Sequence, residues 1–138
     1  MSMNLSISKE SYTLIEPNLH DGRLLGIAIP ADRSVEVAVA DVAGEGYTIV
    51  LEDVLAFHAS DFWEGNIILD VTIMRGEEVR LSDLEPLGGQ MHEKNLRETL
   101  GQIAAKSLFV VQLCPSYGCY FLAVAGGIAI RAKNEAGT

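Results

Sequence analysis

The chain contains two cysteines, Cys114 and Cys119, and they are the first candidates for chemistry. They bracket the stretch Cys-Pro-Ser-Tyr-Gly-Cys, where Pro115 fixes φ early in a turn and Gly118 can accept a positive φ at its end. Strand-like sequence on both sides predicts a hairpin in which the two cysteines form the first cross-strand pair. The Cβ atoms of such a pair lie about 4.5–5.5 Å apart, which is near but not at the distance that a disulfide requires.

Several roles for the cysteine pair remain open. Two structural thiols are expected in a reducing compartment, and a reversible disulfide is expected where the protein meets an oxidant. Redox pairs are usually separated by two residues and precede a helix, which is not the pattern here. A structural zinc site would need two further ligands, and no second cysteine pair supplies them. We therefore predict no metal site, no cofactor and no assigned catalytic residue, with a disulfide between Cys114 and Cys119 as an option.

The three histidines are isolated in the sequence: His20, His58 and His92. His20-Asp21 is similar to the dyad of metal phosphohydrolases, but those sites need further histidines, so a residue in a turn is the stronger interpretation. His58 follows Phe57 in a predicted strand and is the histidine that we select as a binding candidate. Combined with either cysteine it would suggest a small thiol-dependent enzyme, although no glycine loop of the oxyanion type accompanies the cysteines.

The only tryptophan, Trp63, follows Phe62 in a predicted loop between Asp61 and Glu64. Loop aromatics either fold back over a core or anchor an interface, and tryptophan is over-represented at binding hot spots. Phe62 and Trp63, with His58, are therefore the predicted binding residues. They favour a non-catalytic interaction module over an enzyme.

Composition sets the protein class. A chain of 138 residues, 49% hydrophobic and 21% charged, is typical of a single globular domain, here predicted to span residues 1–138. The N-terminus lacks a basic segment followed by an apolar run, so no signal peptide is expected and a cytoplasmic location is predicted.

The formal net charge of −9 argues against nucleic-acid binding, because it repels a phosphate backbone and no basic run offsets it. The same charge favours a protein partner with a basic surface. In size, acidity and strand-rich middle, residues 18–73 resemble some immunity proteins of toxin systems, without a diagnostic motif. The resemblance implies an inhibitor of a basic toxin as an alternative function.

Hydrophobic periodicity predicts the fold. Several segments between residues 23 and 73 alternate or are strand-sized, and Ile67, Leu69, Val71 and Ile73 are expected to point inward from one strand. Leu96, Leu100, Ile103 and Ala104 recur at helical spacing, which predicts one principal amphipathic helix near residues 92–106. The fold class is therefore α+β: a mainly antiparallel sheet, a meander or partial barrel of about 7–8 strands, with that helix.

Residues 107–130 carry no charge, and breaks at residues 114–119 and at Gly126-Gly127 divide them into strand-sized pieces. We predict buried strands and no membrane helix, with a second tight turn at the paired glycines or, alternatively, one long strand with a bulge. One helix can cover only one face of an open sheet, so the other apolar face would remain uncovered. We therefore predict self-association, most simply a homodimer.

Overall fold

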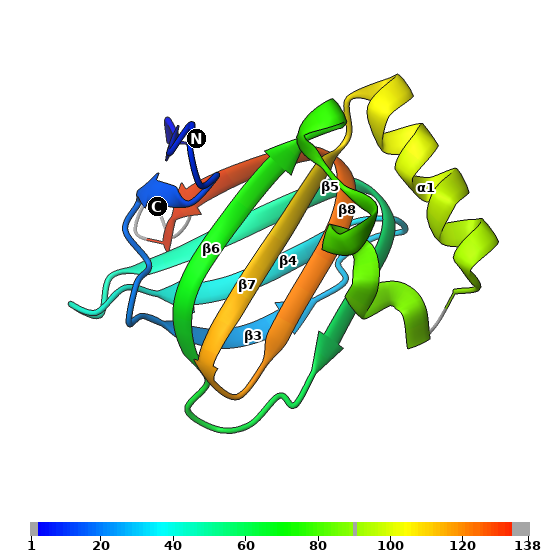
Figure 1. Cartoon of the computed structure of the whole chain (residues 1–138). Coiled ribbons are helices and arrows are strands. Elements are labelled where there is room, and N and C mark those ends of the chain that lie inside the picture. Colours follow the sequence, from blue (N-terminus) through cyan, green and yellow to red (C-terminus); the bar gives the residue numbers. More distant parts are fainter. Residues whose placement is uncertain (1–2, 90, 134–138) are drawn as a thin grey trace.

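The structure, a computed structural model, describes residues 3–89 and 91–133. Six strands form a closed antiparallel barrel in the order β3-β4-β5-β8-β7-β6, and a separate two-stranded hairpin precedes it (Figure 1). The predicted α+β class, mainly antiparallel sheet with one principal helix, is confirmed. The hairpin strands are β1 (Ser6–Ile7) and β2 (Leu14–Glu16), and the barrel strands are β3 (Arg23–Ala28), β4 (Val35–Ala40), β5 (Gly46–Ser60), β6 (Ile67–Arg75), β7 (Phe109–Tyr117) and β8 (Tyr120–Ala132).

The barrel interior is an apolar core built by alternating side chains. Val35, Val37 and Val39 of β4 are all buried, as their period of two predicts, and the residues between them are only partly buried. Facing side chains such as Ile49 and Phe121 complete this core. Because the sheet closes on itself, the inner faces of all six strands bury one another.

A second apolar layer covers part of the outside of the barrel. It consists of η1 (Gly76–Glu78), the 3-10 helix η2 (Leu81–Gly89) and α1 (Glu93–Lys106), of which η2 and α1 lie over one side of the barrel in Figure 1. The buried side chains between this layer and the outer face of the barrel are Met74, Val79, Leu84, Leu87, Ile103, Val110, Leu122 and Val124. The predicted helix is confirmed, but Thr99 is buried and Ala104 is exposed, so the apolar face is rotated slightly from the predicted one.

β7 and β8 pair antiparallel as predicted, but the loop is not at residues 115–118: β7 extends to Tyr117, with Pro115 opposite Ile68, and only Gly118 and Cys119 connect the strands. The second turn predicted at Gly126-Gly127 is absent. β8 continues through both glycines and pairs with β5, where Glu52 faces Gly127. A Cβ atom on Gly126 would lie only 2.9 Å from Cβ of Asp53. Glycine at position 126 therefore makes room for the opposing strand, which has an extra residue between Val54 and Ala56.

β6 departs from simple alternation, which overturns part of the predicted core. Val71 and Ile73 are buried as expected, but Ile67 and Leu69 are exposed and Ile68 points inward. Register shifts on both sides of Ile68 cause this difference. One added residue reverses which face the following side chains occupy, so the strict alternation from Ile67 to Ile73 fails.

The N-terminal hairpin fills a gap in the barrel wall. β3 pairs with β6 only at Arg23 and Ile67, which leaves the later part of β6 without β3 as a neighbour. Thr13 bridges to Thr72 there, and Ile73 N–H donates to the Tyr12 carbonyl at 2.9 Å. The hairpin thereby supplies hydrogen-bond partners to an edge that β3 does not reach.

Residues 107–130 form mainly the strands β7 and β8, as predicted, and not a helix. Among the described residues, no helix is both long enough and apolar enough to cross a bilayer. The inner face of these strands is in the barrel core and much of their outer face lies beneath η2 and α1. The open apolar face from which the sequence predicted a homodimer is therefore already covered.

Candidate functional site

The two cysteines do not form the predicted direct cross-strand pair. Leu113 of β7 faces Phe121 of β8, so in this register Cys114 falls opposite Tyr120 and not opposite Cys119. Cys119 belongs to the barrel core, whereas Cys114, next to the inward-facing Leu113, is on the outer side. Both are free thiols, and their positions on opposite faces of the sheet do not suit a disulfide.

The surroundings of both thiols disfavour the reactive thiolate. Burial raises the pKa of Cys114, and Asp70 raises it further. Burial also raises the pKa of Cys119, an effect that a backbone hydrogen bond at Ser60 opposes and Asp61 reinforces. Because the thiolate is the nucleophile, such cysteines are poorly suited to covalent catalysis.

His58 lies on β5 opposite Leu122, on the outer face of the barrel. It therefore lies on the opposite side of the sheet from Cys119. β8 separates it from β7, and two strand spacings place its Cα about 10 Å or more from that of Cys114. This geometry gives the thiol-dependent alternative no support. Nor does His58 line the hollow that Phe62 and Trp63 line.

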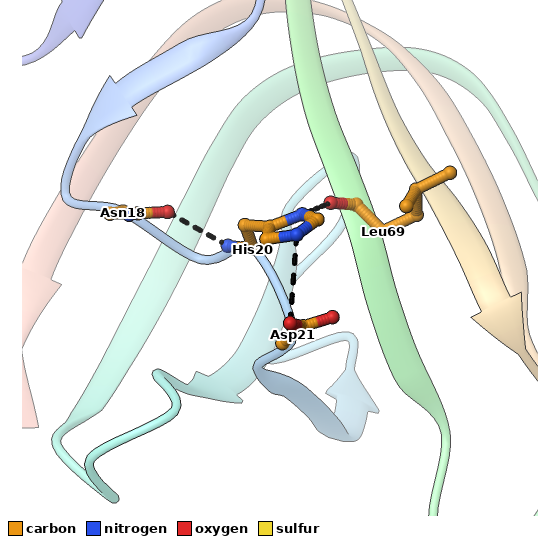
Figure 2. Close-up of polar contacts among 4 residues, drawn as sticks. All are labelled: Asn18, His20, Asp21 and Leu69. Atoms are coloured by element: carbon orange, nitrogen blue, oxygen red, sulfur yellow. Dashed lines mark hydrogen bonds and ion pairs between the residues drawn. The ribbon is translucent and has the colours of Figure 1, made fainter.

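His20 lies in the turn before β3, as predicted, and its ring is held on two sides (Figure 2). Nδ1 is 2.7 Å from the carbonyl oxygen of Leu69, a β6 residue that has no register partner in β7, and Nε2 is 3.6 Å from a carboxylate oxygen of Asp21. The Leu69 carbonyl and then Asp21 raise the pKa of His20, with a smaller contribution from Asp70. The arrangement braces the turn against β6.

Phe62 and Trp63 are exposed in the loop between β5 and β6. This loop and the β7–β8 turn lie at the same end of the barrel (Figure 1). Trp63 is 57% exposed and Phe62 48% exposed, so neither folds back over the core. With Leu25 and Arg23 they line a hollow of about 250 Å³. These aromatics are thus presented to solvent.

Further apolar side chains continue this surface across the neighbouring strands. Ile67 is the register partner of both Arg23 and Tyr117, and residues paired in this way present their side chains on the same face. Ile67 and Tyr117 are also exposed. We call this set the aromatic rim: Leu25, Phe62, Trp63, Ile67 and Tyr117.

Asn66 holds the aromatic rim together from beneath. Its side chain is buried, and its Oδ1 accepts the N–H groups of Trp63 at 2.8 Å and Cys119 at 3.0 Å. Its Nδ2 donates to the Leu24 carbonyl at 3.4 Å. One amide thus links the aromatic loop, the β7–β8 turn and β3, which reduces the freedom of the loop before any partner binds.

Gly118 is required at this junction for two reasons. Its φ of +85° is in the region that favours glycine, and a Cβ atom there would collide with Oδ1 of Asn66. The sequence predicted the first reason but not the second. Asn66, Leu25, Ile67 and Tyr117 were not among the predicted site residues, and a polar amide directly before the apolar run of β6 was the available signal.

The charges around the aromatic rim are mostly negative. Asp61 and Glu64 flank the aromatic pair and are exposed, whereas Arg23 is the cation that lines the hollow. Within residues 3–89 and 91–133, no group of three or more histidine, cysteine, aspartate or glutamate side chains is placed to hold a metal ion. The rim therefore combines exposed aromatic side chains with an acidic border.

Comparison with known proteins gives no relative: no family model, no curated protein and no solved structure matches this chain.

Proposed function

We propose that this protein is a non-catalytic binding protein that docks a basic protein partner on the aromatic rim. The observation that supports this proposal is the exposure of Phe62 and Trp63 on a loop that the buried Asn66 holds in place. Exposed aromatic side chains on a fixed backbone are what interface hot spots require, because they bury a large area with little loss of conformational freedom.

Charge complementarity supports a basic partner. The chain has a net charge of −9, and Asp61 and Glu64 flank the two aromatics. A basic surface would be steered toward this end of the molecule and then held by burial of the aromatics. An immunity-type inhibitor of a basic toxin is one protein class with these properties, and we retain it as the specific form of the proposal.

A second copy of the chain is the competing occupant of the aromatic rim. Closure of the barrel removes the reason for which the sequence predicted a homodimer, since both faces of β7 and β8 are largely covered. A dimer would now have to use the exposed rim, where Asp61 and Glu64 of two copies would repel each other. Light scattering at low micromolar concentration distinguishes the two, and we expect a mass near 14.9 kDa.

Site-specific photocrosslinking tests the proposal. A benzophenone amino acid is placed at position 63 and, in a matched control, at Ile29, another exposed apolar residue that does not belong to the rim. In cells that naturally express the chain, we expect a basic protein to be captured from position 63 alone, and less of it as salt is raised. Equal capture from both positions, or capture of a second copy of this chain, contradicts the proposal.

Affinity for the captured partner, once it is purified, gives the quantitative test. Trp63→Ala should weaken binding by about 30-fold or more, the loss typical of a hot spot. Ile29→Ala should leave the affinity unchanged. Equal affinities for the two variants would show that the aromatic rim does not bind the partner.

A further inference from the structure

A second hollow lies at the other end of β6 from the aromatic rim. Its volume is about 520 Å³, within the range of about 300–1,000 Å³ that small-molecule sites occupy. We call it the N-terminal cleft, and its lining residues are Ile7, Ser8, Lys9, Tyr12, Ile73, Arg75, Glu78 and Phe109.

The N-terminal hairpin forms one wall of this cleft and the barrel forms the other. The hydrogen bond from Ile73 N–H to the Tyr12 carbonyl fixes the hairpin against β6. Phe109 of β7 is the register partner of Arg75, so their side chains share a face. The walls are therefore held by main-chain pairing and not by side chains alone.

The floor of the cleft is apolar and its border is charged. Ile7, Tyr12, Ile73 and Phe109 supply carbon surface, and Ile73 is buried. Lys9 and Arg75 supply two positive charges against the single negative charge of Glu78. In a chain with a net charge of −9, this hollow is locally positive.

Arg75 is held ready to bind an anion. Its Nε donates to the Ser107 carbonyl at 3.2 Å, and its guanidinium carbon lies 4.8 Å from the centre of the Phe109 ring. Within the described part of the chain, no hydrogen bond or ion pair uses its two terminal nitrogens. A guanidinium fixed on one edge and one face presents its remaining N–H groups in the geometry that a carboxylate accepts.

Glu78 does not cancel this preference. Its Oε1 accepts the main-chain N–H of Arg75 at 2.9 Å, as part of the cap of η1. This bond uses one acceptor site of the carboxylate and leaves its negative charge, which the two cations of the lining outnumber. Lys9, exposed in the turn between β1 and β2, provides a second cation from the opposite wall.

We propose that the N-terminal cleft binds a small amphipathic carboxylate. The apolar part, an aromatic ring or a short alkyl chain, would pack on Tyr12, Ile73 and Phe109, and the carboxylate would lie between Lys9 and Arg75. This site is separate from the aromatic rim and does not depend on the protein-binding function.

Two matched probes test this proposal: 2-naphthoate and its neutral analogue 2-naphthalenemethanol. Each is titrated into the 138-residue chain labelled with nitrogen-15, and amide shifts are followed by NMR. We expect saturable shifts at Ile73, Arg75 and Phe109 with naphthoate, and binding at least tenfold weaker with the alcohol. No saturable binding of naphthoate, equal binding of both probes, or shifts confined to Phe62 and Trp63 would each overturn the proposal.

Charge-removing variants test whether naphthoate binds to the cations of the cleft or responds only to the overall charge of the protein. Arg75→Gln and Lys9→Gln should each weaken naphthoate binding about tenfold, the order expected for one charge-assisted hydrogen bond. Lys94→Gln, which removes the same charge from an exposed position on α1, should leave it unchanged. If Arg75→Gln perturbs the fold, the amide spectrum shows it, and Lys9→Gln in its exposed turn remains the test. An equal loss of naphthoate affinity in Lys94→Gln would contradict the assignment of the binding site to the N-terminal cleft.

Discussion

The outside of the barrel carries two apolar surfaces, of which one is covered by other parts of the chain and the other is exposed to solvent. One, over β7 and β8, includes Val110, Leu122 and Val124, and these side chains are fully buried beneath α1 and η2. The other, the aromatic rim at the β5–β6 end, includes Trp63 and remains open. The chain supplies a cover for the first surface and none, within its described part, for the second.

The two surfaces also differ in what holds them. The covered surface is held by apolar contacts, which are many and individually weak. The open one rests on a single buried amide, Asn66, whose oxygen serves two N–H donors from different segments. Apolar contacts build the first surface by excluding water, whereas a hydrogen-bonded support can hold the second in place while it stays in water. The comparison indicates stability as the role of one surface and recognition as the role of the other.

The largest loss of folding stability is expected from a substitution in the covered surface. Ile103→Ala removes a fully buried side chain of α1 and should lower the free energy of unfolding by about 2–5 kcal/mol, measured by urea denaturation. Leu100→Ala, at a partly buried position on the same helix, is the matched comparison and should cost less. A loss under about 0.5 kcal/mol for Ile103→Ala would show that α1 does not cover the barrel.

Substitution of Asn66, which supports the open surface, should cause an intermediate loss of folding stability. Asn66→Ala leaves the N–H groups of Trp63 and Cys119 without their shared acceptor, which should cost about 1–3 kcal/mol in the free energy of unfolding. It should also loosen the aromatic loop, so that acrylamide quenches Trp63 fluorescence more strongly. Asn18→Ala removes an exposed acceptor of one N–H group and should change neither measurement appreciably. Unchanged quenching in Asn66→Ala would contradict the role of the amide.

Trp63 itself should matter little for stability. Trp63→Ala removes the largest side chain of the rim, but from a solvent-exposed position, so the free energy of unfolding should change by less than about 0.5 kcal/mol. Urea denaturation followed by circular dichroism measures this without the tryptophan signal. A cost above about 1 kcal/mol would make Trp63 a cover for the core and remove the distinction between the two surfaces.

The elements of this fold were predictable where periodicity was clean. The period-two pattern of Val35, Val37 and Val39 and the helical spacing of Leu96 and Ile103 each gave the correct element, because a regular pattern has one burying face. Gly118 correctly predicted the turn between the two strands, whereas Pro115 lies inside β7 and not in the turn. That the chain is one domain stays a prediction.

Register and irregularity were not predictable from the pattern. One residue of register separates a direct cysteine pair from the observed placement of Cys114 and Cys119 on opposite faces. The shift beside Ile68 likewise exposes Ile67, which the sequence assigned to the core. Such shifts depend on which strands meet when the barrel closes, and that information is non-local. The site was predictable only in part for the same reason: Phe62 and Trp63 are local to one loop, whereas Asn66 acts between three segments.

The smallest effect concerns His20, which braces the turn beside the open surface. The Leu69 carbonyl and Asp21 raise its pKa above the ordinary value of 6.5, so folding favours the protonated ring. The resulting stabilisation is complete below the pKa of the unfolded chain and is lost as pH rises through the higher folded pKa. NMR titration of the ring should therefore give a higher midpoint in the folded protein than in urea. Asp21→Asn should reduce the rise without abolishing it, because the contact with the Leu69 carbonyl, its largest cause, remains. A folded midpoint at or below the unfolded one would mean that the ring does not hold the turn to β6.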